Sequence, residues 1–146
     1  MDVTDRVYTA GMTDDEVDER LRTSETGVLA LARDDDAYAI PLAYHYDGDA
    51  IRFRLSDDGH SRKLAFLETT GEASFVVYGY DGPRDSWSVL VAGSVRELSP
   101  DEADVTAAEV DERYAPLRVF DEATEETTLR TYELQIEAVT GRRTAE

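Results

Sequence analysis

Cysteine is absent from this chain of 146 residues, and lysine occurs once, at Lys63. Without cysteine there is no disulfide framework and no thiolate metal site. No apolar run approaches the roughly 20 residues that span a bilayer, and the first 21 residues lack the charged-then-apolar order of a signal peptide. The sequence therefore predicts a soluble, cytoplasmic protein.

Basic residues are scarce, with 15 Lys and Arg against 33 Asp and Glu and a formal net charge of -18. Nucleic acid and anionic membranes are poor partners for such a chain, because both are bound through basic patches. The surface also repels itself unless salt screens it. Because 41% of the residues are hydrophobic and fall into organised runs, we interpret the chain as a folded, halophilic protein rather than a disordered acidic segment.

Turn and capping signals divide the chain into short elements. Thr13-Asp14-Asp15-Glu16 is a capping box that predicts a first helix ending near Thr23. Ser61 is a candidate cap for a second helix stopping at Gly71, and Ser99-Pro100-Asp101-Glu102 is a second capping box that predicts a helix towards Tyr114. Apolar and alternating runs predict strands at 28–32, 37–46, 51–55, 73–80, 87–98 and 129–139.

The order of these elements indicates the fold class. Six strands carry helices inserted between some of them, without a βαβ rhythm and without a Gly-rich phosphate loop. We therefore expect an α+β, mainly β, antiparallel fold closed into a barrel, with short inserted helices. The length suits a single domain over residues 1–146.

The single lysine lies in the sequence DDGHSRKLAFL, residues 57–67, between a predicted strand and a predicted helix. An ammonium at Lys63, a guanidinium at Arg62 and the hydroxyl of Ser61 at a helix start form a combination that favours phosphate. His60 can add a donor, and Arg54 on the preceding strand can extend the positive patch together with Arg52.

The alternative is that these cations only form exposed ion pairs with nearby acids, each contributing about 0–1 kcal/mol. Glu68, Asp57 and Asp58 are the available partners. Spacing alone leaves both interpretations open.

Other chemistries receive less support. The two histidines, His45 and His60, would need a carboxylate to complete a metal site, and acids are too common here for such a triplet to be informative. No Gly-x-Ser-x-Gly elbow occurs, so hydrolase chemistry is not indicated. We expect most tyrosines to be structural, either in the core or at a dimer interface.

The segment from about Gly27 to Leu98, which contains IPLAYHYDGDAIRFRLSDDGHSRKLAFL and SWSVLVAGSVREL, carries a family resemblance together with the final strand TYELQIEAVTGR. It resembles the pyridoxamine 5'-phosphate oxidase-like flavin-binding family, in its short flavin-nucleotide-binding branch and with a haloarchaeal-type composition. The resemblance implies a six-stranded split barrel that binds FMN at a homodimer interface. It also implies cofactor contacts from residues of four segments, which are Ile40, Pro41, Leu42, Ala43, Arg54, Leu55, Ser56, His60, Ser61, Arg62, Lys63, Trp87 and Ser88.

Within this resemblance, Ser61-Arg62-Lys63 corresponds to the family's phosphate grip, and Trp87 is expected near the flavin. His45 is either a histidine near the flavin or a strand histidine with a satisfied hydrogen bond. Two features depart from the long oxidases: serine stands at position 88 in place of glutamine, and the chain has only five residues after Gly141. The C-terminal arginine and histidine that hold the oxidases' substrate phosphate are therefore not matched.

The expected function is that of an FMN-dependent oxidoreductase with a small-molecule electron donor or acceptor, because flavin chemistry does not require a protein acid or base. The alternatives are a non-catalytic flavin-binding or storage module, the same fold carrying a deazaflavin or haem, and a cofactor-free dimeric module. The sequence leaves the substrate and the catalytic residues unassigned.

Overall fold

A computed structural model describes residues 9–57, 62–99, 101–102 and 128–145 of the chain. Within these residues the chain forms eight strands and two complete helices. The strands are β1 (Thr9–Gly11), β2 (Thr26–Arg33), β3 (Asp36–Ala43), β4 (His45–Tyr46), β5 (Ala50–Asp57), β6 (Ala73–Tyr80), β7 (Ser86–Glu97) and β8 (Thr128–Thr144). The helices are α1 (Asp14–Thr23) and α2 (Arg62–Thr69).

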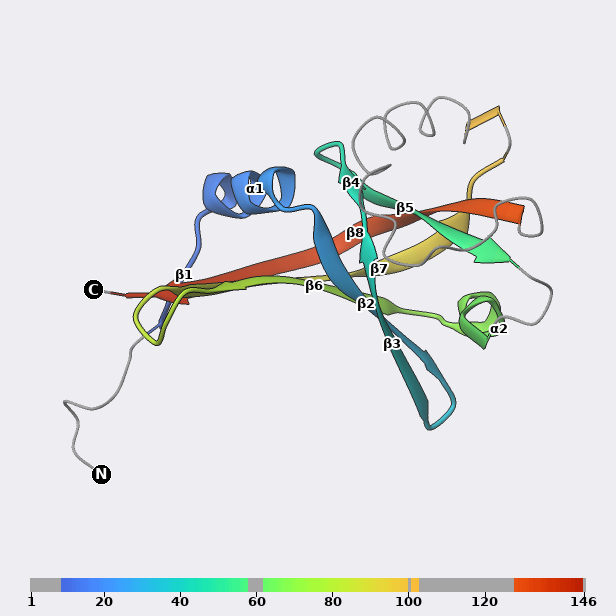
Figure 1. The fold of residues 1–146 in the computed structure, drawn as a ribbon, viewed down its shortest axis with the longest axis horizontal. Coiled ribbons are helices and arrows are strands. Elements are labelled where there is room, and N and C mark those ends of the chain that lie inside the picture. The colour runs from blue at the N-terminus through green and yellow to red at the C-terminus, as the bar shows by residue number, and fades with distance from the viewer. Residues whose placement is uncertain (1–8, 58–61, 100, 103–127, 146) are drawn as a thin grey trace.

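All strand pairs are antiparallel and belong to one sheet in the order β3-β2-β6-β7-β8-β5-β4, with β1 added beside β8 (Figure 1). The sheet curls so that β3 also contacts β5. This arrangement confirms the predicted α+β, mainly antiparallel fold and agrees with a split barrel.

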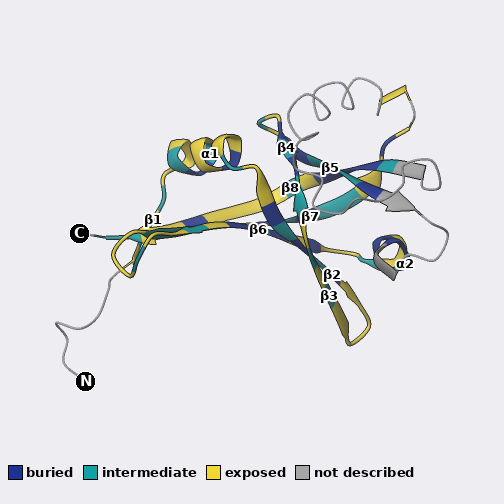
Figure 2. Ribbon diagram, viewed as in Figure 1, coloured by how far each residue is buried: buried dark blue, intermediate teal, exposed yellow. Residues whose placement is uncertain are grey.

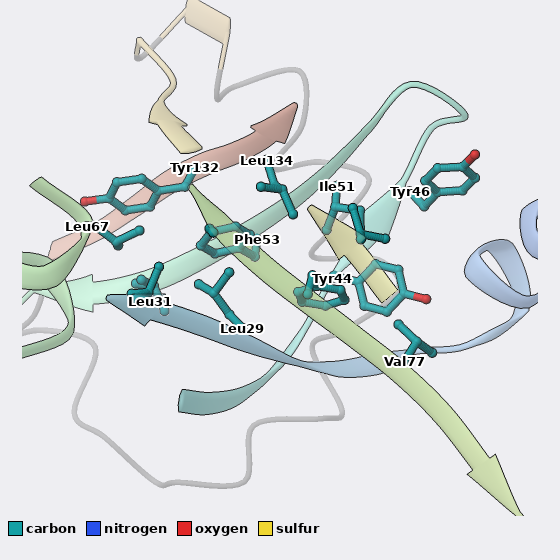
Figure 3. Packing of buried hydrophobic residues seen from close by; sticks show 14 of the residues in the cluster. Leu29, Leu31, Tyr44, Tyr46, Ile51, Phe53, Leu67, Val77, Tyr132 and Leu134 are labelled. Carbon is teal, nitrogen blue, oxygen red and sulfur yellow. The ribbon is translucent and has the colours of Figure 1, made fainter. Parts of the chain in front are cut away.

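The core lies inside the curled sheet, where every second residue of each strand points inward. Leu29, Phe53 and Leu134 are fully buried (Figure 3), and so is Phe75. Tyr44 packs edge-on against Phe75, with ring centroids 5.1 Å apart. Its hydroxyl donates to the carbonyl oxygen of Leu21 at 2.7 Å, so this buried polar group is satisfied.

Helix α1 begins as its sequence predicts. The Glu16 N–H donates to Thr13 Oγ1 and the Thr13 N–H donates to Glu16 Oε1, both at 3.2 Å, which completes the capping box. Val17 and Leu21 face the sheet and are buried. The helix therefore covers one face of the long strands (Figure 1).

The last strand is longer than predicted, because β8 continues past the expected end at Val139 to Thr144. Gly141 lies under α1, where a Cβ atom would stand 2.6 Å from Met12 Sδ and 2.9 Å from Val17 Cγ2. This glycine gives α1 room to pack against the strand rather than ending it.

The remaining differences concern the ends of elements. The predicted strand 37–46 is interrupted at Tyr44, so that β4 is separate, and the short strand β1 was not predicted. The turn at Asp47-Gly48 is confirmed, with Gly48 at φ +102°. Ser99 and Glu102 exchange the reciprocal bonds of a capping box, but the helix predicted after them lies outside the described residues.

The far end of β6, β7 and β8 has two unlike faces. Helix α1 covers one of them (Figure 1). The opposite face carries Tyr78, Tyr80 and Leu90, which are exposed. No described helix lies over this face (Figure 2). This end of the sheet therefore presents aromatic and apolar side chains to solvent.

Candidate functional site

The predicted phosphate corner lies at the start of α2. Arg62 and Lys63 are the first two residues of this helix, which follows β5, whereas His60 and Ser61 lie outside the described residues. Leu64, Phe66 and Leu67 are buried and anchor the first two turns in the core. Because a helix start carries partial positive charge and unpaired N–H groups, the location suits an anion.

The strand before this helix carries the second predicted group. Arg54, Leu55 and Ser56 lie on β5, with Arg54 opposite Thr131 of β8 in the sheet. Leu55 belongs to the core. Because residues alternate along a strand, Arg54 lies on the opposite face from Leu55.

Arg52 precedes Arg54 on the same face, but its charge is matched by acids. Its Nε atom lies 3.1 Å from Glu133 Oε2 and its Nη1 atom 3.1 Å from Asp47 Oδ2. The expectation that Arg52 extends the positive patch is therefore wrong for this conformation.

Glu133 also lies 3.4 Å from Arg96 Nε on β7. We call these three residues the Arg52–Glu133–Arg96 cluster. It joins β5, β8 and β7 across the sheet, and Glu133 is buried at its centre. Arg96 in turn binds Glu102 at 3.0 Å. Hydrogen bonds from Arg96 and from the N–H and hydroxyl groups of Ser99 lower the pKa of Glu102 to about 2.

The predicted segment Ile40–Ala43 lies on β3, which ends the sheet order and so has one edge not paired within the described sheet. Pro41 suits an edge strand because it has no N–H to donate. Ile40 and Leu42 pack against the core, whereas Pro41 is exposed. Strand β3 contacts β5, and Pro41 lies opposite Val28 of β2, which in turn pairs with Val76 of β6.

Trp87 and Ser88 lie on β7 and point to opposite faces. The Trp87 indole lies across Gly79, where an added Cβ atom would overlap its Nε1 atom. The Arg20 guanidinium stands 4.5 Å from the centroid of the ring. Ser88 faces the other way, between Tyr78 of β6 and Arg142 of β8 in the sheet. The predicted flavin contact of Trp87 stays a prediction.

Arg54 and the start of α2 form one group of these predicted residues, and Ser88 lies far from it in one chain. Pro41 of β3 is connected through Val28 and Val76 to Leu90, so it lies three strands from β7 and close to the level of Ser88. Arg54 pairs with Thr131, whereas Ser88 pairs with Arg142, eleven residues further along β8. At about 3.3 Å per residue the two positions are separated by roughly 35 Å. This distance exceeds the length of an FMN molecule, so one flavin cannot reach both groups within one chain.

A hollow of about 310 Å³ lies on the exposed face around Ser88. We call it the slot and define it by the side chains that share this face, which are Thr9, Tyr78, Tyr80, Ser86, Ser88 and Arg142. The two serines lie between the tyrosines of β6 and Arg142 of β8. The slot therefore combines aromatic side chains, hydroxyl groups and one cation.

No signal in the sequence indicated this slot. Most tyrosines were expected in the core or at a dimer interface; Tyr44 lies in the core, and Tyr78 and Tyr80 are 66% and 65% exposed in the single chain. The spacing of two residues between them predicted a shared face, but only the strand register brings Arg142 to that face.

His45 lies on β4 opposite Arg52 and is partly buried. Its role near a flavin stays a prediction. The described part of the chain contains no group of three side chains suited to a metal ion, and none of its helices has the length and apolar character needed to cross a membrane.

Several solved structures share this fold. An FAD-binding protein from Mesorhizobium loti superposes with a TM-score of 0.78 at 20% identity, over 94% of this chain and 99% of that chain. An FAD-binding protein from Mycobacterium smegmatis gives 0.68 at 18% identity, over 93% and 100%. An FAD and heme binding protein from the same organism gives 0.72 at 16% identity, over 94% and 74%.

At these identities the similarity establishes the fold. No curated protein matches the chain. A family model described as pyridoxamine 5'-phosphate oxidase matches residues 13–143. Because this match extends over most of its length, the chain belongs to the pyridoxamine 5'-phosphate oxidase family.

Proposed function

We propose that the protein binds FMN between two copies of the chain and acts as a flavin-dependent oxidoreductase. Similar structures are named as FAD-binding proteins, which supports a flavin as the ligand of this fold. A bound flavin supplies the hydride and electron chemistry, while the chain holds its phosphate and covers its ring.

The observation that carries the proposal is the separation of the two groups of site residues. The start of α2 and Arg54 of β5 form one group, and Ser88 lies roughly 35 Å away along β8. A flavin that touches both groups needs a second copy of the chain. In a two-fold dimer each copy then contributes one group to each of two equivalent sites.

The exposed sheet face supplies a surface for that second copy. Leu90 is 50% exposed, on the face opposite α1. Val76, next to Leu90 in the sheet, shares this face. Apolar surface of this kind on a soluble domain is typical of an interface.

The first test is a titration of the apoprotein with FMN, followed by flavin fluorescence, for the wild type and Lys63→Ala. If Lys63 holds the phosphate, the variant binds about 1–3 kcal/mol more weakly, the range for hydrogen bonds to charged groups. Arg84→Ala is the control, because it removes an exposed cation from the loop between β6 and β7. Equal affinities for the wild type and Lys63→Ala would contradict the phosphate assignment.

The salt dependence of the same titration tests the role of the acidic surface. With a net charge of -18, the protein repels a phosphate at low ionic strength, and added salt screens that repulsion. We therefore propose that FMN binds more tightly at high salt, as suits a halophilic protein. A steady loss of affinity with added salt would oppose this.

The second test concerns the dimer. Leu90→Glu places a charge on the exposed sheet face and is expected to shift the protein to monomer and to weaken FMN binding. Val139→Glu is the control, because Val139 is 39% exposed and lies on the face that carries α1. Sedimentation velocity measures both. A wild type that is monomeric, or a Leu90→Glu variant that remains dimeric, would oppose the two-copy site.

Catalysis is distinguished from storage by a separate measurement. An oxidoreductase passes electrons from its reduced flavin to an acceptor faster than free FMN does, whereas a storage module does not. The absorbance spectrum of protein purified from its own host identifies the chromophore, since flavin, deazaflavin and haem differ in their spectra.

A further inference from the structure

Two neighbouring arginines near the end of β8 have opposite environments. Arg143 lies on the face that carries α1, and its Nε atom donates to Glu16 Oε2 at 2.7 Å. Arg142 lies on the other face, and its Nη2 atom donates to Thr9 Oγ1 at 2.7 Å and to the Thr9 carbonyl oxygen at 3.0 Å. Both of the oxygens that bind Arg142 are neutral.

Arg142 forms no ion pair with any acid among the residues that the structure describes. Arg33 and Arg84 also form none among these residues, but the Arg142 guanidinium is held by its two hydrogen bonds to Thr9. Arg52, Arg96, Arg130 and Arg143 each have a carboxylate within 3.4 Å. None of the acids in the described ranges neutralises the charge of Arg142, and the two bonds to Thr9 hold the guanidinium in place.

The side chains around Arg142 have the chemistry to hold an aromatic ring. Tyr78 and Tyr80 line it from β6 with most of their surface exposed. Ser86 and Ser88 are small residues between the tyrosines and β8, and they leave the hollow of about 310 Å³ open. That volume lies at the lower end of the range for small-molecule pockets.

We propose that the slot binds a planar aromatic carboxylate. Its ring packs on the tyrosines, and its carboxylate accepts hydrogen bonds from the Arg142 donors that Thr9 does not use. As a substrate assignment, this proposal rests on the proposed function. In the two-copy site, the slot of one chain lies next to the residues of the other chain that hold the flavin phosphate. The substrate class is then an aromatic acid that binds beside the flavin and not in its place.

The test uses 4-nitrobenzoate as the probe, with the neutral 4-nitrobenzamide as its control, measured by isothermal titration calorimetry in high-salt buffer. Both the apoprotein and the FMN-loaded protein are titrated. We expect 4-nitrobenzoate to bind to both forms and more tightly than the amide. Arg142→Gln is expected to weaken 4-nitrobenzoate ten- to a hundredfold, which corresponds to loss of a charged hydrogen bond. Arg142→Lys keeps the charge but loses the fork of donors. Its affinity for the probe should therefore lie between those of the wild type and Arg142→Gln.

Arg33→Gln is the matched control, because it removes an exposed guanidinium at the end of β2 that does not line the slot, and it should change probe affinity less than twofold. An equal loss in both variants, no binding to the wild type, or displacement of the probe by FMN would overturn the proposal. A failure of the proposed function would give a different result. FMN would then not bind, while 4-nitrobenzoate would still bind through Arg142.

Discussion

Two groups of arginine side chains lie on the sheet surface away from the core, and they differ in how their charge is balanced. In the Arg52–Glu133–Arg96 cluster, one buried carboxylate lies between two guanidinium groups. In the slot, Arg142 binds only the neutral oxygens of Thr9 among the described residues. The first arrangement holds strands together, and the second leaves a cation facing a hollow.

The position of a cation along the sequence is therefore a poor guide to its role. Arg52 lies on the same strand as a predicted cofactor contact, yet its charge is already neutralised by Asp47 and Glu133. Arg142 lies near the chain end, where the sequence suggested no role. What decides between them is the set of acids that the fold brings within reach.

The largest expected effect comes from breaking the cluster. Glu133→Gln leaves two guanidinium groups around a neutral side chain and is expected to lower the free energy of unfolding by about 2–4 kcal/mol. Arg142→Gln is the matched variant and should change it by no more than about 0.5 kcal/mol, since the side chain is exposed and has no ion pair among the described residues. Denaturant unfolding at constant salt measures both. Equal losses would remove the distinction between the two regions.

A smaller loss of stability is expected from a change on the α1 face of the sheet, opposite the slot. Gly79 leaves space for the Trp87 indole on the α1 face, and an added Cβ atom would overlap Trp87 Nε1. Gly79→Ala should therefore cost about 1–3 kcal/mol through overpacking and shift the emission of the only tryptophan. Gly71→Ala is the control, because a Cβ atom there has nothing within 4 Å. An unchanged emission spectrum and stability would mean that the indole moves aside freely.

Much of this fold follows from local signals in the sequence. The capping box at Thr13, the turn at Asp47-Gly48 and the alternation in Ile51–Leu55 each depend on neighbouring residues, and the structure confirms them. The extension of β8 was missed because Gly141 looked like a strand end, whereas its role depends on Met12, a residue far away in the chain.

The candidate site was predictable only in part for the same reason. Each of its segments was identified along the chain, but the distance between Arg54 and Ser88 depends on how both pair with β8. The slot depends on the register of three strands and on which surface cations are paired with acids. Neither can be derived from spacing along one segment.

The smallest effect concerns Glu102, the acid that binds Arg96 of the cluster, and depends on pH. Arg96 and Ser99 lower the pKa of Glu102 from 4.5 to about 2. Since the folded state binds this proton less readily than the unfolded state, the contribution of Glu102 to stability is complete above pH 4.5 and is lost as the pH falls towards 2. Glu102→Gln should therefore be less stable than the wild type at neutral pH, with the gap closing through this window. Unfolding free energies measured at several pH values for both proteins give the gap directly, and a gap that stays constant down to low pH would mean that Glu102 is not stabilised by Arg96 as the structure indicates.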